Sequence, residues 1–64
     1  MPPLPLPMRS SAIASAVYEP ETETLVVVFY NGRTATHTVS PAMVAAFVEA
    51  PSQGQFYNRY IKGS

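Results

Sequence analysis

The chain has 64 residues, no cysteine and one histidine, and its four basic residues balance its four acidic ones. A chain this short forms one domain near the lower size limit for independent folding, where disulfides, a metal or a partner usually add stability. Without cysteine, disulfides and thiolate metal sites are excluded, and one histidine cannot build a zinc site without several carboxylates. We therefore expect no metal and no other cofactor, so association with protein remains as the source of added stability.

Charge and hydropathy limit the partners further. Only 12% of the residues are charged, against 47% that are hydrophobic, and no basic run or acidic tail directs the chain to nucleic acid. No apolar segment approaches the roughly 20 residues of a membrane span, and Met1 to Pro7 lacks the charged start and long apolar core of a signal peptide. We expect a protein of the cytoplasm, or of an assembled particle such as a virion, without membrane contact.

Residues 1–9 form a proline-rich arm that precedes a single domain at residues 10–62. Four of the first eight residues are proline, which favours an extended, polyproline-like conformation without internal hydrogen bonds. Two interpretations stay open at this point. The arm is a disordered tail, or it is a stiff anchor whose Leu4 and Leu6 dock in a groove of a neighbouring protein.

Three β-prone runs follow the arm, at residues 12–18, 24–30 and 33–39. Between the last two lies Asn31-Gly32, the dipeptide that best suits a two-residue type I′ hairpin turn. Together these runs predict a three-stranded antiparallel meander. The turn also predicts the facing pairs of the hairpin, which are Phe29 with Thr34, Val27 with Thr36, and Leu25 with Thr38.

Two short helices are predicted after the strands. Ser40 can cap the first helix, because its side-chain oxygen accepts an unpaired backbone amide and the following Pro41 has no amide to lose. This helix covers residues 41–50, and Pro51 ends it. Ser52 can cap a second helix at residues 54–61. The predicted fold class is α+β, with both helices packed on one face of the meander and the arm extending from it.

The strand at residues 24–30 is apolar on both sides, although a sheet with one wet face should alternate apolar and polar side chains. We assign Ile13, Tyr18, Leu25, Val27 and Phe29 to the core beneath the helices, where Met43, Phe47, Tyr57 and Ile61 contact them. The opposite face then needs a cover. The predicted protein interface consists of the arm leucines and this opposite face: Leu4, Leu6, Val26, Val28, Tyr30 and Ala35.

Several motifs have a familiar order. Leu25, Val27 and Phe29 form an L-x-V-x-F strand, and the segment from Ala50 to Ile61 has the form A-x-S-x-G-x-[YF]-[YF]-N-x-x-I. Together with Ser10-Ser11, Ile13, Tyr18, Gly32 and Val39, they resemble the KTSC domain, a small domain at the C-terminus of some lysyl-tRNA synthetases that also occurs as stand-alone proteins. The resemblance covers about four fifths of the chain and implies the same α+β fold.

The resemblance fails at one pair of positions. Members of the family have been suggested to bind RNA, and their central Y-x-Y pair would fall on Thr34 and Thr36 of this chain. Aromatic side chains on a sheet are the natural surface for base stacking, so no RNA site is carried over. A nucleic-acid-binding module stays open as the alternative function. Its candidate residues are Arg33, Arg59, Tyr60 and Lys62.

No catalytic signature is present. His37 is the only imidazole, and no nucleophile elbow or glycine-rich phosphate loop surrounds the serines. We therefore expect neither an enzyme nor a small-molecule substrate. The sequence favours a non-catalytic assembly module that associates with itself or with a larger complex, and a virion is one setting that suits it. A small inhibitor of a host enzyme fits the same features.

Overall fold

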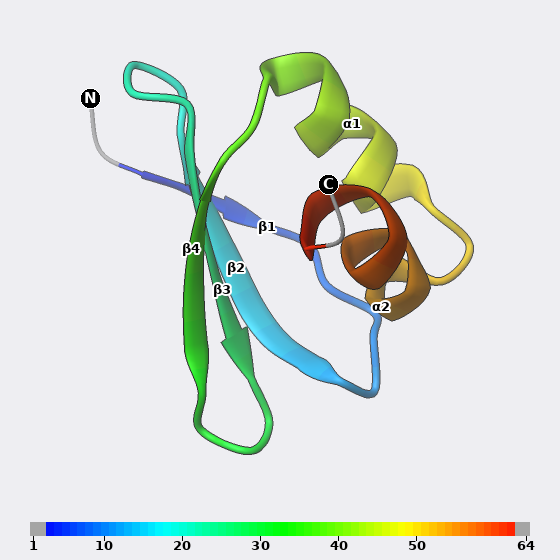
Figure 1. Cartoon of the computed structure of the whole chain (residues 1–64). Helices are drawn as coiled ribbons and strands as arrows, with labels where there is room; N and C mark the ends of the chain where they lie inside the picture. Colours follow the sequence, from blue (N-terminus) through cyan, green and yellow to red (C-terminus); the bar gives the residue numbers. More distant parts are fainter. Residues whose placement is uncertain (1–2, 63–64) are drawn as a thin grey trace.

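The computed structural model, which describes residues 3–62, is a four-stranded antiparallel sheet with helices on one face (Figure 1). Each strand pairs with the next along the chain, in the order β1-β2-β3-β4. The strands are Leu4–Leu6 (β1), Ile13–Glu19 (β2), Thr24–Phe29 (β3) and Thr34–Thr38 (β4), and the helices are Pro41–Glu49 (α1), Gln53–Phe56 (α2) and the π-helix Tyr57–Lys62 (η1). The α+β class is confirmed, with one strand more than predicted.

The additional strand comes from the proline-rich arm. β1 pairs antiparallel with β2, so that Leu4 lies opposite Tyr18 and Leu6 lies opposite Ala16. Proline is tolerated in an edge strand when its nitrogen points away from the neighbouring strand, and the leucines on either side of Pro5 keep their amides. The arm therefore completes the chain's own sheet. Because Tyr18 and Ala16 are buried, Leu4 and Leu6 lie on the helix side.

The register of the β3–β4 hairpin differs from the prediction by one residue. Val28 lies opposite Thr34, Val27 opposite Ala35 and Leu25 opposite His37. The loop has three residues instead of two, because the Gly32 N–H donates to the Phe29 carbonyl at 3.0 Å and the Phe29 N–H donates to the Arg33 carbonyl at 2.8 Å. Only Gly32 of this loop has a positive φ, at 89°, as in the three-residue hairpin that ends on a left-handed glycine. The prediction of a two-residue type I′ turn is therefore wrong.

A slip of one residue moves each side chain of a strand to the other face of the sheet. Ala35, which we predicted on the face away from the helices, therefore lies on the helix side with Val27, and His37 lies there with Leu25. Ala35 packs against the core, so its predicted place on the opposite face is corrected. The face away from the helices instead carries the three threonines of β4, which are all exposed: Thr34, Thr36 and Thr38.

The helices begin where the capping serines predict. The Ser40 hydroxyl accepts from the Met43 N–H at 3.3 Å, and the Ser52 hydroxyl accepts from the Gln55 N–H at 3.4 Å. The second helical segment departs from the prediction because it changes from α to π geometry at Tyr57. Its i→i+5 hydrogen bonding widens the turn, a change that is frequent at functional sites.

The core lies between the sheet and the helices. Ile13, Leu25, Val27 and Phe47 are almost completely shielded from solvent, with exposed fractions of 0–1%. Tyr18, Tyr57 and Ile61 are also buried, and Phe29 and Met43 pack at the margin of the core. The predicted assignment of core residues is therefore confirmed, although two of them are only partly buried.

Gly32 provides a test of the hairpin loop. A Cβ at this position meets no atom within 4 Å, so any cost of substitution comes from its φ of 89° alone. We expect Gly32→Val to lower the free energy of unfolding by more than about 1 kcal/mol, because β-branched residues resist positive φ. Gly32→Asn is the control and should cost less, since asparagine tolerates this region. Equal urea midpoints for the two variants would contradict the left-handed loop.

Candidate functional site

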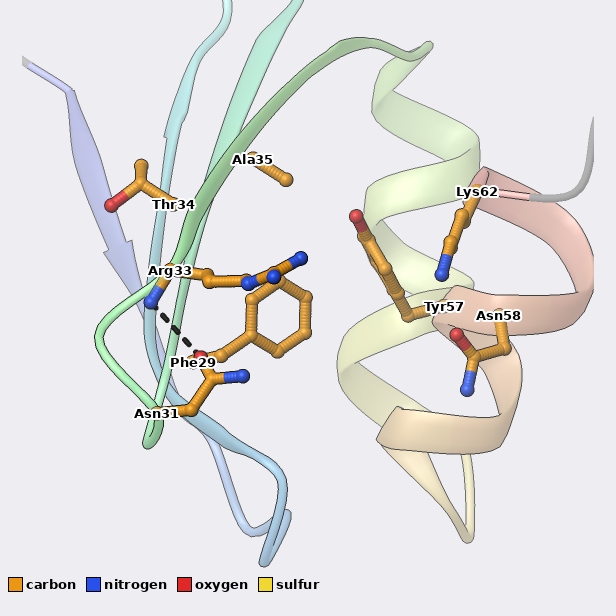
Figure 2. Close-up of a pocket in the computed structure, with 8 residues that line it drawn as sticks. All are labelled: Phe29, Asn31, Arg33, Thr34, Ala35, Tyr57, Asn58 and Lys62. Atoms are coloured by element: carbon orange, nitrogen blue, oxygen red, sulfur yellow. Dashed lines mark hydrogen bonds between the residues drawn. The ribbon is translucent and has the colours of Figure 1, made fainter.

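A cleft of 340 Å³ lies between the β3–β4 hairpin and the C-terminal helix. Figure 2 shows the Arg33 side chain extending from the start of β4, and Lys62 and Asn58 extending from η1, toward the same gap. The residues around the cleft are two basic residues, two asparagines, an alanine, two aromatic residues and a threonine whose side chain turns away to the other face of the sheet (Figure 2): Arg33, Lys62, Asn31, Asn58, Ala35, Phe29, Tyr57 and Thr34. It therefore combines hydrogen-bond donors with an apolar wall.

The π geometry of η1 explains how Lys62 reaches this cleft. Tyr57 and Lys62 are five residues apart, and the wider turn of a π-helix brings residues at this spacing closer together around the helix axis. In an α-helix they would lie about 140° apart around the axis, because each residue advances by about 100°. The wide turn thus brings Lys62 to the cleft that Tyr57 lines, while Ile61 still faces the core.

The wall of the cleft is an aromatic cluster centred on Tyr57. Its ring meets Phe29 edge to face, with the ring centroids 5.3 Å apart, and its hydroxyl lies 2.6 Å from His37 Nε2. Burial raises the pKa of Tyr57 above its usual value, because the charged phenolate would lose its hydration. The His37–Tyr57 contact joins β4 to η1 and holds the two sides of the cleft at a fixed separation.

The charges of the molecule are separated along the sheet. Within residues 3–62, no carboxylate lines the cleft. Three of the four acidic residues, Glu19, Glu21 and Glu23, lie at the β2–β3 turn, which is at the opposite end of the strands from the β3–β4 hairpin (Figure 1). Although the net charge is zero, the β2–β3 turn forms an acidic end of the sheet and the cleft beside the β3–β4 hairpin forms a basic end.

The predicted nucleic-acid residues are only partly brought together. Arg33 and Lys62 line the same cleft. Arg59 instead faces a neighbouring shallow depression with Gln55 and Asn58. The Tyr60 ring, half exposed, packs on Phe56 with the centroids 4.8 Å apart. The four residues therefore do not form one continuous patch.

The predicted protein interface is divided between the two faces of the sheet. Val26 and Val28 lie on the face away from the helices, each about half buried, and Val17 joins them opposite Val26. Figure 1 shows the helices gathered on the other side of the sheet, so no described element covers these valines. Tyr30 lies in the hairpin loop with 67% of its surface exposed. Leu4 and Leu6 contact the helix side and do not extend the valine surface.

Sequence reasoning missed several residues of these surfaces. A structural role was favoured for Tyr57, and Asn31 was assigned to the turn, although both line the cleft. Val17 belongs with Val26, and its alternation with the buried Ala16 and Tyr18 was a signal that could have identified it. The position of Lys62 had no such signal, because the helical period of the sequence does not distinguish α from π geometry.

Neither a metal centre nor a membrane-spanning helix is found in the part of the chain that the structure describes. No group of three or more histidine, cysteine, aspartate or glutamate side chains within residues 3–62 is placed to hold a metal ion. No helix in the same part of the chain is long and apolar enough to cross a membrane.

The fold and these surfaces define a class: a small α+β domain in which helices cover one face of an antiparallel meander and leave the other face open. The model of the KTSC domain family matches residues 9–64, which is nearly the whole chain. The protein therefore belongs to the KTSC domain family, as the sequence motifs predicted. Among curated proteins, no relative matches the chain.

The buried tyrosines predict how stability depends on pH. Burial raises the pKa of Tyr57 and, together with the negative charge of Glu23, the pKa of Tyr18, whereas an unfolded tyrosine ionises near pH 10. The folded state thus favours the neutral phenols. Their contribution to stability is fully present below about pH 10 and is lost as the pH rises through the folded pKa values.

We expect Tyr57→Phe to lower the free energy of unfolding by about 1 kcal/mol at neutral pH, because the hydrogen bond to His37 is lost. The same variant should lose less stability than the parent between pH 10 and pH 12, since it no longer contains the buried phenol at this position. Urea unfolding followed by circular dichroism across this range measures both effects. Parallel alkaline profiles of the two proteins would contradict the role assigned to Tyr57.

Proposed function

We propose that the protein is a non-catalytic module that binds other protein, as a self-associating unit or as an accessory subunit of a larger complex. The observation that carries this proposal is the open face of the sheet, defined as Val17, Val26 and Val28 together with the exposed Thr34, Thr36 and Thr38. Contiguous apolar surface that no part of the domain covers marks an interaction site in a small soluble protein.

Two properties of the open face support protein as its ligand. Its centre is formed by β-branched valines on two adjacent strands, and Val17 lies directly opposite Val26. Among the residues of the described strands, Glu19 at the end of β2 is the only charged one on this face, and it lies opposite Thr24. A core depleted of charge with a polar rim is the arrangement of protein–protein interfaces, in contrast to the basic surfaces that bind nucleic acid.

Val28→Lys tests the open face. A lysine here remains solvated in the isolated domain, so we expect the far-ultraviolet circular dichroism spectrum to stay close to that of the parent. In a dry interface the same charge is costly, and the assembly should lose mass as measured by light scattering across protein concentration.

Two substitutions accompany this test. Val28→Thr is the matched control, because it keeps the β-branched shape and should leave assembly largely intact. Val27→Lys, one residue away on the buried face, should unfold the domain. If Val28→Lys unfolds the chain, or if its assemblies keep the mass of the parent, the open face is not the binding surface.

A second candidate function is nucleic-acid binding at the cleft. It is favoured by one observation, that Arg33 and Lys62 converge beside Asn31 and Asn58 with no carboxylate among the lining residues described. Arginine and lysine neutralise phosphates, and the amide side chains can donate to phosphate or base oxygens. The candidate ranks second because two cations give a weak electrostatic footprint.

We expect single-stranded RNA to bind no more tightly than about 10 μM at physiological salt, as measured by fluorescence anisotropy. Any binding at low salt should weaken with added salt and with Arg33→Gln or Lys62→Gln, since each removes a cation from the cleft. Arg59→Gln is the control outside the cleft and should have less effect. A tighter, salt-sensitive complex that is lost in Arg33→Gln would place nucleic-acid binding first.

A further inference from the structure

The two edges of the sheet differ in how they are protected. β1 carries Pro5 at its centre, and a proline nitrogen in an edge strand points outward without a proton to donate. β4, with the sequence Thr-Ala-Thr-His-Thr, contains neither proline nor a residue of fixed charge. Natural proteins usually blunt edge strands with such residues, because an unprotected edge is a template for another strand. Only one edge of this sheet is therefore left available.

The hydrogen-bond pattern shows which groups β4 presents to solvent. The Phe29 N–H donates to the Arg33 carbonyl at 2.8 Å, and the Val39 N–H donates to the Glu23 carbonyl at 2.9 Å. Because bonded and non-bonded pairs alternate in an antiparallel ladder, the backbone groups of Ala35 and His37 face β3. Those of Thr34, Thr36 and Thr38 face outward. Within residues 3–62, none of these outward groups has a hydrogen-bond partner.

We propose that β4 pairs antiparallel with β4 of a second copy of the chain, about a two-fold axis at Thr36, to form one continuous sheet. In this register Thr36 faces its own equivalent, and Thr34 faces Thr38 of the other copy. Each facing pair exchanges N–H···O=C bonds in both directions, which satisfies the outward groups. The inference rests on the proposed protein-binding function and specifies both the partner and the surface.

The chain itself supplies the complementarity that this pairing needs. Threonines at every second position place matching β-branched side chains opposite each other across the axis. Arg33 precedes β4, and Glu23 lies beside Val39 at its other end. The antiparallel pairing brings Arg33 of one copy beside Val39 of the other, two strands from Glu23. That separation is about 10 Å between Cα atoms, which an arginine and a glutamate side chain can span.

The charges also select the direction of pairing. A parallel arrangement would place the two Arg33 residues on neighbouring strands at one end of β4, away from both Glu23 residues at the other end, and like charges side by side repel. In the antiparallel arrangement each Arg33 approaches a Glu23, once at each end. Figure 1 shows β4 at the margin of the sheet, with the helices packed to one side of it, which leaves the strand accessible along its length.

Edge pairing leaves Val17, Val26 and Val28 uncovered, so it can be separated experimentally from binding through the open face. The full chain carrying Val28→Lys, in which contacts through the open face are suppressed, is the background for the test. We expect sedimentation equilibrium to show a concentration-dependent dimer of this protein. We also expect its Thr36 amide to exchange hydrogen more slowly as the dimer forms.

Thr36→Pro in this background removes the outward N–H without breaking a β3–β4 hydrogen bond, and it should raise the dimer Kd by about 30-fold, since one bond is lost from each copy. Thr36→Val keeps the N–H and the β-branched shape, and its Kd should match that of the background. In a second pair of variants, Arg33→Glu alone should weaken the dimer, and adding Glu23→Arg should restore it.

Three results would overturn the inference. They are a Val28→Lys protein that stays monomeric up to millimolar concentration, a dimer unaffected by Thr36→Pro, or a charge reversal that the second reversal fails to restore. If the parent protein assembles and Val28→Lys is monomeric, the open face alone holds the assembly, so edge pairing fails and the proposed function stands. If Val28→Lys leaves unchanged a dimer that Thr36→Pro dissociates, edge pairing stands and binding through the open face is contradicted.

Discussion

The register of the β3–β4 hairpin is the constraint on which the other features depend. A loop of three residues, closed by the left-handed Gly32, determines that Ala35 and His37 face the helices. From this follows the contact between His37 and Tyr57, which joins the last strand to the C-terminal helix and forms the wall of the cleft. The same register sends the threonines of β4 to the open face and their backbone groups to the free edge. One loop residue thus decides the composition of three surfaces.

The number, type and order of most elements could be predicted from the sequence, because the signals are local. Ser40-Pro41 and Ser52 mark helix starts by hydrogen bonding within a few residues, and both caps are present in the structure. The register could not be obtained from the turn, because Asn-Gly suits a two-residue loop as well as a three-residue loop that ends on glycine. Burial favours the observed register, because this register places Ala35 partly buried against the core and leaves Thr34 and Thr36 exposed.

The cleft was less predictable than the fold. Arg33 and Lys62 were identified as cations, but they are far apart in the sequence, and they line one cleft in a structure where η1 widens into a π-helix. The residue pattern of this segment does not predict the change from α to π geometry. The additional strand had a different cause, because a proline-rich segment and an edge strand share the same extended backbone. Whether such a segment pairs depends on the unoccupied edge of β2, which is a property of the whole sheet.

Gln53, the one buried polar side chain among the described residues, has a consequence for the order of folding. Its amide accepts from the Arg9 N–H at 2.6 Å and donates to the Pro7 carbonyl at 3.1 Å and the Val48 carbonyl at 3.0 Å. The contact with Arg9 spans 44 residues, so it closes a loop of most of the chain. Such long-range closure is entropically costly until the intervening chain is compact. We therefore expect β1, which precedes Pro7 and Arg9, to be secured late, after the hairpins and α1 have formed.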